Sequence, residues 1–477
     1  MNNHDFGIVG LGVMGRNLLL NIADHGFSVV GMARDPKKAS TLLSESEDHM
    51  QVSATTDPAS FVRQLKSPKA IMLLVPAGKP VDETIESLLP HLEKGDIIVD
   101  GGNSYFTDTD RRFIELQAKG IHYFGMGVSG GENGARFGPS MMPGGDKKAY
   151  ERLRPIFEAI AAKVDGEPCV TYLGNGSAGN YVKMIHNGIE YGIMQLIAET
   201  YDLMRKVLGI KDSLIQETFS SWNNTNLKSF LIEITGKVLN KFDGDTDVRL
   251  INVISDVARA KGTGKWTSQN AMDLQVPVPT IDAAVNIRDL SKYKDQRRQA
   301  SSKLIWESTA HFTDDQTEIL NTLHDALYFS IINTYAQGMA QLQVASEHYD
   351  YGLNLEDISR IWRGGCIIRS VSLEDFRQAY IRDPRLPNLL LDDKIASDLS
   401  GKQKSARSTI KLAVDAGVAV PAFMSALSYF DAYRSAELPT NLIQAQRDYF
   451  GAHLYERTDS TGTYHSIWEI PVQSQVF

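Results

Sequence analysis

The chain has 477 residues, of which 42% are hydrophobic and 22% charged. This ordinary globular composition excludes a disordered or fibrous protein. The formal net charge of −9 argues against a general binder of nucleic acid or anionic membranes, since such proteins are normally basic. Two cysteines, Cys169 and Cys366, are too few for a disulfide framework and stand at no metal-ligand spacing. With neither a signal peptide nor an apolar run of roughly 18 residues, the sequence predicts a soluble, cytoplasmic protein without a bound metal.

Strand and helix patterns alternate through the first third of the chain. Short apolar runs predict strands, and amphipathic stretches predict helices. The expected strands lie at 6–10, 28–33, 70–75, 96–100, 122–125 and 169–173, and the expected helices at 13–25, 36–44, 81–92, 107–119 and 146–162. This alternation predicts right-handed βαβ units around a mostly parallel sheet.

The pattern changes at a glycine-rich segment, 174–179, which is typical of a boundary or hinge. Beyond it, helical periodicity dominates at 181–208, 213–219, 227–239, 317–349 and 402–416, and from about Leu442 no regular pattern remains. We therefore expect an α/β fold with an N-terminal Rossmann-type domain, then a large all-α domain and an irregular C-terminal tail. The expected bounds are 1–178, 179–440 and 441–477.

The segment Gly10-Leu-Gly12-Val-Met-Gly15 follows the first expected strand and opens the first helix. Gly10 permits a tight turn, Gly12 lets the backbone approach a pyrophosphate, and Gly15 allows close packing of helix on strand. The helix N-terminus then offers free N–H groups to the phosphates. In this context the loop predicts dinucleotide binding. The alternative is a glycine-rich turn in an unrelated α/β fold.

The end of the second strand, Ala33-Arg34-Asp35, bears on the choice between NAD and NADP. Ala33 cannot accept a hydrogen bond from a ribose 2′-hydroxyl, whereas Arg34 can bind a 2′-phosphate or be a solvated surface residue. Asp35 would repel that phosphate if it faced the ribose. As the N-cap before Pro36 it would face its own helix instead, and we expect this arrangement. The pattern favours NADP and leaves NAD open.

A polar line formed by Lys183, Asn187 and Glu190 follows one face of the first long helix, with His186 and Tyr191 beside it. Apolar residues occupy roughly the opposite face. The pattern fits either a solvated polar side or a side that faces a cofactor cleft, where Lys183 and Glu190 would bracket a small molecule. Two glycine-bearing segments, at 127–131 and 261–266, offer N–H groups suited to anions, although each alone is more often a turn.

Seven segments together resemble the 6-phosphogluconate dehydrogenase family, within the β-hydroxyacid dehydrogenase superfamily. The segments are 97–103, 127–132, 138–145, 181–191, 261–266, 294–297 and 441–453. The wider superfamily shares the glycine loop, the serine-glycine-glycine segment and the helix lysine, but not the last three segments.

The resemblance implies the oxidative decarboxylation of 6-phospho-D-gluconate to D-ribulose 5-phosphate and CO2 with reduction of NADP, as in the oxidative pentose phosphate pathway and gluconate utilisation. It also implies a homodimer in which the tail of each chain reaches into the partner subunit. Lys183 would act as general base, taking the proton of the 3-hydroxyl as hydride leaves C3, and would later return it to the carbonyl oxygen. Glu190 would be the general acid that protonates C1. As a base, Lys183 needs a lowered pKa.

The same resemblance implies three groups of binding residues. Those expected to hold the sugar acid are Asn103, Ser129, Gly130, Gly131, His186 and Asn187. Those expected to hold the 6-phosphate are Tyr191, Lys261, Arg288, Arg447 and His453, the last two from the other chain. Those expected to hold the cofactor are Gly10, Gly12, Val13, Met14, Gly15, Ala33, Arg34, Asp35, Val75, Pro76, Ala77 and Asn103.

The chain departs from the family pattern at three places, all near the cofactor. Gly12 stands where alanine is usual, Ala33-Arg34-Asp35 replaces Asn-Arg-Ser/Thr, and Pro76 stands where lysine is common. The same reaction with NAD preferred therefore remains an alternative. A related hydroxyacid dehydrogenase acting on an unphosphorylated substrate is a second alternative, and a non-enzymatic nucleotide sensor is a third. The expected phosphate-binding cations argue against the second, because a neutral substrate would leave them unpaired.

Overall fold

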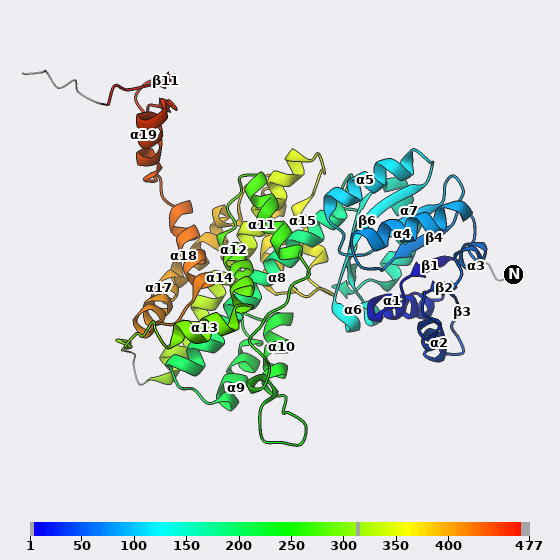
Figure 1. Ribbon diagram of the computed structural model, residues 1–477, viewed down its shortest axis with the longest axis horizontal. Helices are drawn as coiled ribbons and strands as arrows, with labels where there is room; N and C mark the ends of the chain where they lie inside the picture. The colour runs from blue at the N-terminus through cyan, green and yellow to red at the C-terminus, as the bar shows by residue number, and fades with distance from the viewer. Residues whose placement is uncertain (1–3, 312–314, 469–477) are drawn as a thin grey trace, which may run out of the picture. The chain divides into compact units, whose positions relative to one another are not determined.

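The computed structural model describes residues 4–311 and 315–468, in two compact units at Met1–Leu427 and Ser428–Phe477. The first unit contains a sheet with helices on both faces, followed by a helical region (Figure 1). The α/β fold followed by a large helical part is thus confirmed. Within the described residues, no helix is both long and apolar enough to cross a membrane.

Seven strands form the sheet, in the order β3-β2-β1-β4-β5-β6-β7. Their bounds are β1 Phe6–Val9, β2 Val29–Met32, β3 Val52–Thr55, β4 Ala70–Leu73, β5 Ile97–Asp100, β6 His122–Ser129 and β7 Ser140–Gly145. The pairs are parallel except β6–β7, and in register Ile8 of β1 lies beside Gly31 and Met72. Every residue of β1, β2, β4 and β5 is buried, which is typical of a sheet covered on both faces.

The helices around this sheet are α1 Val13–Asp24, α2 Pro36–Ser44, α3 Pro58–Arg63, α4 Lys79–Leu88, α5 Phe106–Gln117, α6 Gly131–Phe137 and α7 Lys147–Ile160, and a 3-10 turn follows α4 at Leu89–His91. Leu18 of α1 and Phe157 of α7 share one core with Ile8 of β1. Phe61 of α3 and Ile85 of α4 belong to a second core. The two cores cover opposite faces of the sheet, because neighbouring residues of a strand point to opposite sides.

Two predictions for this region are corrected. A strand was expected at 169–173, but these residues contribute only a single bridge, between Val170 and Met141, and a small hairpin of β8 Lys163–Val164 and β9 Glu167–Pro168 precedes them. The strand β7 was not predicted, since its sequence contains Pro143 and two glycines. Proline is tolerated there because β7 lies at the edge of the sheet.

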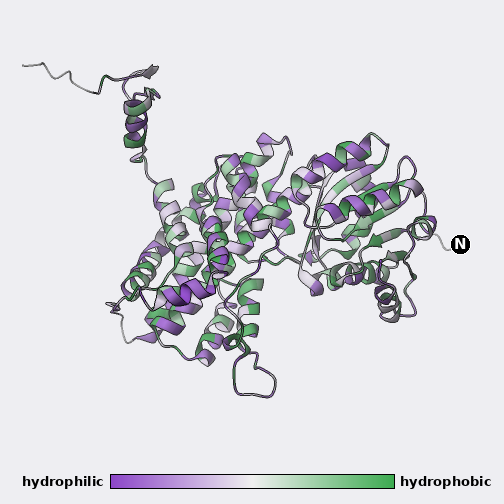
Figure 2. Cartoon of the chain, in the orientation of Figure 1, coloured by the Kyte–Doolittle hydropathy of each residue, from purple (hydrophilic) through white to green (hydrophobic). Residues whose placement is uncertain are grey.

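Eleven further helices follow within the described chain, of which α18 spans the point where the two units divide. They are α8 Ala178–Asp202, α9 Asp212–Trp222, α10 Phe230–Leu239, α11 Thr263–Asp273, α12 Pro279–Ser291, α13 Lys294–Ser301, α14 Gln316–His348, α15 Leu355–Ile361, α16 Ser372–Arg382, α17 Asp393–Ala416 and α18 Pro421–Tyr433. A π-helical turn extends α8 at Leu203–Val207, and 3-10 turns lie at Leu250–Asn252 and Leu389–Leu391. Polar and apolar residues alternate around many of these helices (Figure 2), as expected when one side of a helix packs on a core.

Glycines let the first half of α8 lie directly on strands β6 and β7. A Cβ atom added at Gly179 would stand 2.4 Å from the carbonyl oxygens of Gly125 and Met142. A Cβ added at Gly127 would stand 2.4 Å from the Cβ of Lys183. Since real Cβ atoms do not approach so closely, only glycine permits this contact, and it holds Lys183 at a defined place against the sheet.

The second unit begins with the end of α18 and contains α19 Thr440–Gly451 and a hairpin of β10 Tyr455–Glu456 with β11 Thr463–Tyr464. The buried carboxylate of Asp448 accepts hydrogen bonds from the backbone of Leu454 and Ser466 and from the side chains of His465 and Trp468. The prediction of an irregular tail is therefore corrected for 440–451, which is helical. The last nine residues of that predicted tail lie outside the described residues.

Candidate active site

The glycine loop between β1 and α1 has the geometry of an anion-binding turn. Gly10 has a φ of 103°, and a Cβ added there would stand 2.4 Å from the oxygen of Leu74; one added at Gly15 would stand 2.0 Å from the oxygen of Gly10. A Cβ at Gly12 would meet nothing within 4 Å, so the usual family alanine would also fit there. No side chain caps the start of α1, which leaves its N–H groups free for a phosphate.

Two adjoining cavities of about 690 and 810 Å3 lie on either side of this loop. All twelve residues predicted to hold the cofactor line one or both of them: Gly10, Gly12, Val13, Met14, Gly15, Ala33, Arg34, Asp35, Val75, Pro76, Ala77 and Asn103. The second cavity is also lined by Lys261 and Trp266, which come from the helical region. The cavities therefore reach from the sheet to the elements that follow α8.

Asp35 faces its own helix, as predicted. Its carboxylate accepts a hydrogen bond of 2.9 Å from the backbone N–H of Lys37, so it caps the start of α2. Arg34 is exposed and lines the first cavity together with Lys38, a cation that the sequence analysis did not single out. In the sequence, Lys38 follows Arg34 by four residues, the spacing of one helical turn, and this was the one local indication of it.

The polar line on α8 is buried, so the interpretation of a solvated polar side is wrong. Lys183 is 6% exposed, His186 0% and Asn187 8%. His186 lies between the two expected catalytic groups: its Nδ1 is 3.3 Å from Nζ of Lys183 and 3.8 Å from Oε2 of Glu190. The three side chains therefore form one contiguous cluster inside the protein.

The ring of His186 is fixed from both of its nitrogens. Nδ1 lies 3.0 Å from the amide oxygen of Asn187, to which it donates in the tautomer with the proton on Nδ1. Nε2 then accepts a hydrogen bond, and it lies 3.1 Å from Oγ of Ser129 and 2.9 Å from Sγ of Cys366. The hydroxyl of Ser129 in turn accepts from the backbone N–H of Ile367. Burial and the nearby charge of Lys183 favour the neutral form of this ring.

Burial shifts the pKa of each member of this cluster toward its uncharged form. It lowers the pKa of Lys183, an effect that the charge of Glu190 partly opposes. It lowers the pKa of His186 well below the usual value, and the nearby Lys183 adds to that shift. It raises the pKa of Glu190, against the effects of Lys183 and Arg288. A neutral amine and a protonated carboxyl can serve as base and acid.

One cation, Arg288, lies at the far end of the line. The guanidinium carbon of Arg288 lies 3.5 Å from the centre of the Tyr191 ring, a cation–π contact that orients the arginine. Lys261 is exposed at the second cavity, just before α11 begins. Arg447 and His453 belong to the second unit, on α19 and just after it, and both are exposed there.

Gly130 and Gly131 follow β6 at the start of α6, with φ values of 115° and 63°. A Cβ at Gly130 would collide with the carbonyl oxygen of Gly365 at 2.6 Å, so the segment that carries Cys366 and Ile367 packs against this turn. Cys366 lies 180 positions from His186 along the chain, and no local pattern connects the two. The sequence analysis therefore did not predict it as a site residue.

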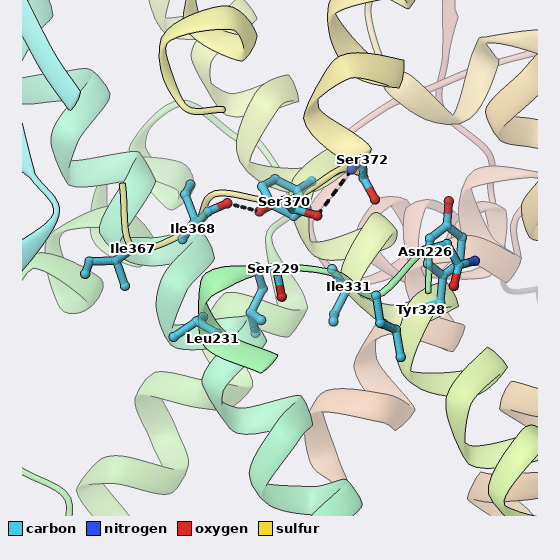
Figure 3. Close-up of a pocket in the computed structure, with 12 residues that line it drawn as sticks. Asn226, Ser229, Leu231, Tyr328, Ile331, Ile367, Ile368, Ser370 and Ser372 are labelled. Atoms are coloured by element: carbon cyan, nitrogen blue, oxygen red, sulfur yellow. Dashed lines mark hydrogen bonds between the residues drawn. The ribbon is translucent and has the colours of Figure 1, made fainter. Parts of the chain in front are cut away.

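A small cavity lies on the other side of this segment (Figure 3). It measures about 10 Å3 and is lined by residues that include Ser229, Tyr335, Ile367 and Ile368. Such a volume holds no more than a single water molecule. We exclude it as a substrate site.

A glycine loop at two cavities, and a buried lysine on a helix packed against the same sheet, define a dinucleotide-binding enzyme of the dehydrogenase class. Two family models, described as the NAD binding domain and the C-terminal domain of 6-phosphogluconate dehydrogenase, match residues 5–174 and 179–468. The chain therefore belongs to the 6-phosphogluconate dehydrogenase family.

Individual relatives agree with this assignment. A Bacillus subtilis protein named 6-phosphogluconate dehydrogenase, NADP(+)-dependent, decarboxylating, is 51% identical over 468 residues, which span 98% of this chain and 100% of the relative. A Saccharomyces cerevisiae 6-phosphogluconate dehydrogenase is 48% identical over 99% of this chain and 95% of its own. A solved Plasmodium falciparum 6-phosphogluconate dehydrogenase superposes with a TM-score of 0.93 at 43% identity, covering 97% of this chain and 100% of the other.

Proposed function

We propose that this protein catalyses the NADP-dependent oxidative decarboxylation of 6-phospho-D-gluconate to D-ribulose 5-phosphate and CO2. The observation that carries this proposal is the cluster of Lys183, His186 and Glu190. Its lysine packs against Gly127, next to Val128 in the wall of the second cavity. The names of the relatives support the substrate and the loss of CO2, and the name of the Bacillus subtilis relative supports NADP.

The residues around the two cavities fit a dinucleotide. The open side of Gly12 and the uncapped start of α1 suit the pyrophosphate, and Arg34 with Lys38 suits a 2′-phosphate. The bound cofactor supplies the hydride acceptor for the oxidation. We assign to the protein the tasks of holding the sugar acid, moving its protons and neutralising its phosphate.

Lys183 takes the proton of the 3-hydroxyl while C3 is oxidised to a ketone. The 3-keto acid then loses CO2, because the carbonyl accepts the electron pair of the broken bond. The ammonium of Lys183 donates to that carbonyl oxygen and stabilises the negative charge that develops there. Glu190 gives its proton to C1 of the resulting enediol while Lys183 takes back the proton of the enol hydroxyl, which yields the ketose. Burial of both groups supports these roles.

The remaining predicted residues bind the two ends of the substrate in this proposal. Those that hold the sugar acid are Asn103, Ser129, Gly130, Gly131, His186 and Asn187. The 6-phosphate lies among Tyr191, Lys261 and Arg288, joined by Arg447 and His453 of the partner subunit. A phosphomonoester is dianionic near neutral pH, and lysine and arginine are the side chains that pair with it best.

We further propose a homodimer with shared active sites, in which residues 441–477 of each chain reach the partner and the helical domain provides the dimer contacts. Large exposed apolar side chains support this, among them Leu304, Ile305 and Trp306 in the first unit and Phe450 in the second. The cytoplasm is the proposed compartment, in keeping with two cysteines that are both free thiols.

A steady-state assay tests the reaction. Purified protein is given 6-phosphogluconate or unphosphorylated gluconate, with NADP or NAD, and both cofactor reduction and CO2 release are measured. We expect turnover with 6-phosphogluconate and a kcat/KM for NADP above that for NAD. Faster turnover of gluconate would favour the unphosphorylated-substrate alternative, and a cofactor ratio below one would favour NAD. Absence of CO2 with both cofactors would leave only the sensor interpretation.

A further inference from the structure

The segment 294–297 has no role in the mechanism above, although it is one of the seven that define the resemblance. We propose that its two cations, Lys294 and Arg297, form ion pairs with Asp256. These ion pairs position the loop 253–261, which carries Lys261, for binding of the substrate phosphate. Asp256 is then a positioning residue, acting through Lys261. This inference rests on the proposed function, because it assumes that Lys261 meets a phosphate.

Both carboxylate oxygens of Asp256 are engaged by helix α13. Nζ of Lys294 lies 2.8 Å from Oδ1, and Nη2 of Arg297 lies 2.9 Å from Oδ2. Lys294 also donates to the hydroxyl of Ser255, at 3.4 Å. Hydrogen bonds from Lys294 and Arg297 lower the pKa of Asp256 to about 2, so the carboxylate stays ionised at any pH where the enzyme would be assayed. Helix α13 is almost wholly hydrophilic (Figure 2), which suits ion pairs at the surface rather than packing in a core.

A second set of contacts ties the same loop to the end of helix α12. The backbone N–H of Ala258 donates to the hydroxyl of Ser291 at 3.0 Å, and that hydroxyl donates to the carbonyl of Arg288 at 2.7 Å. The guanidinium of Arg297 also donates to the carbonyl of Ser291, at 3.0 Å. The loop bearing Lys261 is thus linked to the helical turn bearing Arg288, the other phosphate cation of the same chain.

These tethers matter because the loop has little other support. Residues 253–261 are all exposed and form no helix or strand, and α11 begins only at Thr263. A segment with few buried contacts takes its position from such local hydrogen bonds. Exposed ion pairs add little to folding stability, so we expect their loss to affect phosphate binding rather than the stability of the protein.

The test uses Asp256→Asn in the full-length enzyme, with Asp202→Asn as the matched control. Asp202 also forms an exposed pair with a lysine, Lys206, but on α8 and away from the loop. For Asp256→Asn we expect the KM for 6-phosphogluconate to rise about tenfold, the loss of one charge-assisted contact, with kcat within about twofold of wild type. The control and the rescue variant Asp256→Glu should stay close to wild type, and all three should keep the wild-type melting temperature.

A double-mutant cycle shows whether Asp256 acts through Lys261. On a Lys261→Ala background, Asp256→Asn should raise the KM no further, whereas independent effects would multiply. With unphosphorylated gluconate as the substrate, Asp256→Asn should leave the KM unchanged. An unchanged KM in Asp256→Asn, a multiplied effect in the double variant, or an equal loss with gluconate would each overturn the inference. Failure of the proposed function would look different, since the wild-type enzyme itself would not turn over 6-phosphogluconate.

Discussion

At the scale of single residues, the main feature is a buried lysine and histidine with a partly buried glutamate on one helix. Ionised groups are costly to bury, so burial shifts the pKa of each member toward its uncharged form. His186 contacts both Lys183 and Glu190, and burial together with the nearby charge of Lys183 lowers its pKa well below the usual value. A base and an acid can therefore coexist on one helix without forming an ion pair.

The pH dependence of kcat/KM follows from these shifts. Activity should rise with pH as Lys183 loses its proton, at a lower pH than for a free lysine, and fall as Glu190 loses its proton, at a higher pH than for a free glutamate. Glu190→Gln removes a negative charge that raises the pKa of Lys183, so the rising limb should move to lower pH. Turnover should also slow by about a hundredfold.

The measurement is a profile of kcat/KM against pH for wild type, Glu190→Gln and a control, Glu217→Gln, which is exposed on α9. The control removes the same charge at a distance and should leave both limbs in place. A rising limb that does not move in Glu190→Gln would show that the two groups are not coupled as the structure indicates.

At the scale of elements, the start of helix α2 separates two roles that are adjacent in the sequence. The carboxylate of Asp35 is used in capping the helix, while Arg34 stands free at the cavity wall with Lys38. The negative charge next to Arg34 is therefore directed to the helix N-terminus, where it is favourable. This explains how an Arg-Asp pair can serve an NADP site.

Substitutions at these two positions test that explanation. Arg34→Ala should raise the KM for NADP by about 10- to 100-fold, the loss of a charge-assisted contact, and leave the KM for NAD nearly unchanged. Asp35→Asn keeps a good N-cap and removes the charge, so it should change the NADP/NAD ratio of kcat/KM by no more than about twofold. A large gain in NADP preference in Asp35→Asn would show that the carboxylate faces the ribose instead.

Some elements were predictable from sequence because their ends carry strong local signals. Helix α2 was predicted at its observed bounds, since Asp35 and Pro36 mark its start. The helices α11 and α13 were not, because their polar sequences show little apolar periodicity. In the site, the spacing of Lys183 and Glu190 was visible, but burial of their side of the helix depends on packing partners far along the chain. Cys366 had no local signal for the same reason.

At the scale of the whole molecule, the residues proposed for the phosphate fall in both compact units. Tyr191, Lys261 and Arg288 belong to the first, and Arg447 and His453 to the second. In the proposed dimer the second unit of one chain completes the site of the other. Each active site would then need an intact first unit from one chain and an intact second unit from the other.

Mixing two inactive variants tests this arrangement. Lys183→Ala alone should abolish turnover, and Arg447→Ala should reduce kcat/KM for 6-phosphogluconate about a hundredfold. After the two are unfolded and refolded together, half of the dimers should be hybrids with one intact site each, giving about a quarter of wild-type activity. Wild-type protein refolded alone is the control for recovery. No gain above the separate variants would place Arg447 in the site of its own chain.

The contact of α8 with strands β6 and β7 has a practical consequence for engineering. Because Gly125, Gly127 and Gly179 let α8 lie directly on the strands, the position of Lys183 is fixed by the nucleotide-binding sheet, although this residue follows segment 174–179 in sequence. A chimera joined at segment 174–179 would combine an α8 and a sheet from different proteins, whose contact surfaces do not match. A single methyl group added at one of these glycines would displace Lys183 from the sheet. When the nucleotide-binding region is exchanged between relatives, the first turns of α8 should therefore be transferred together with the sheet.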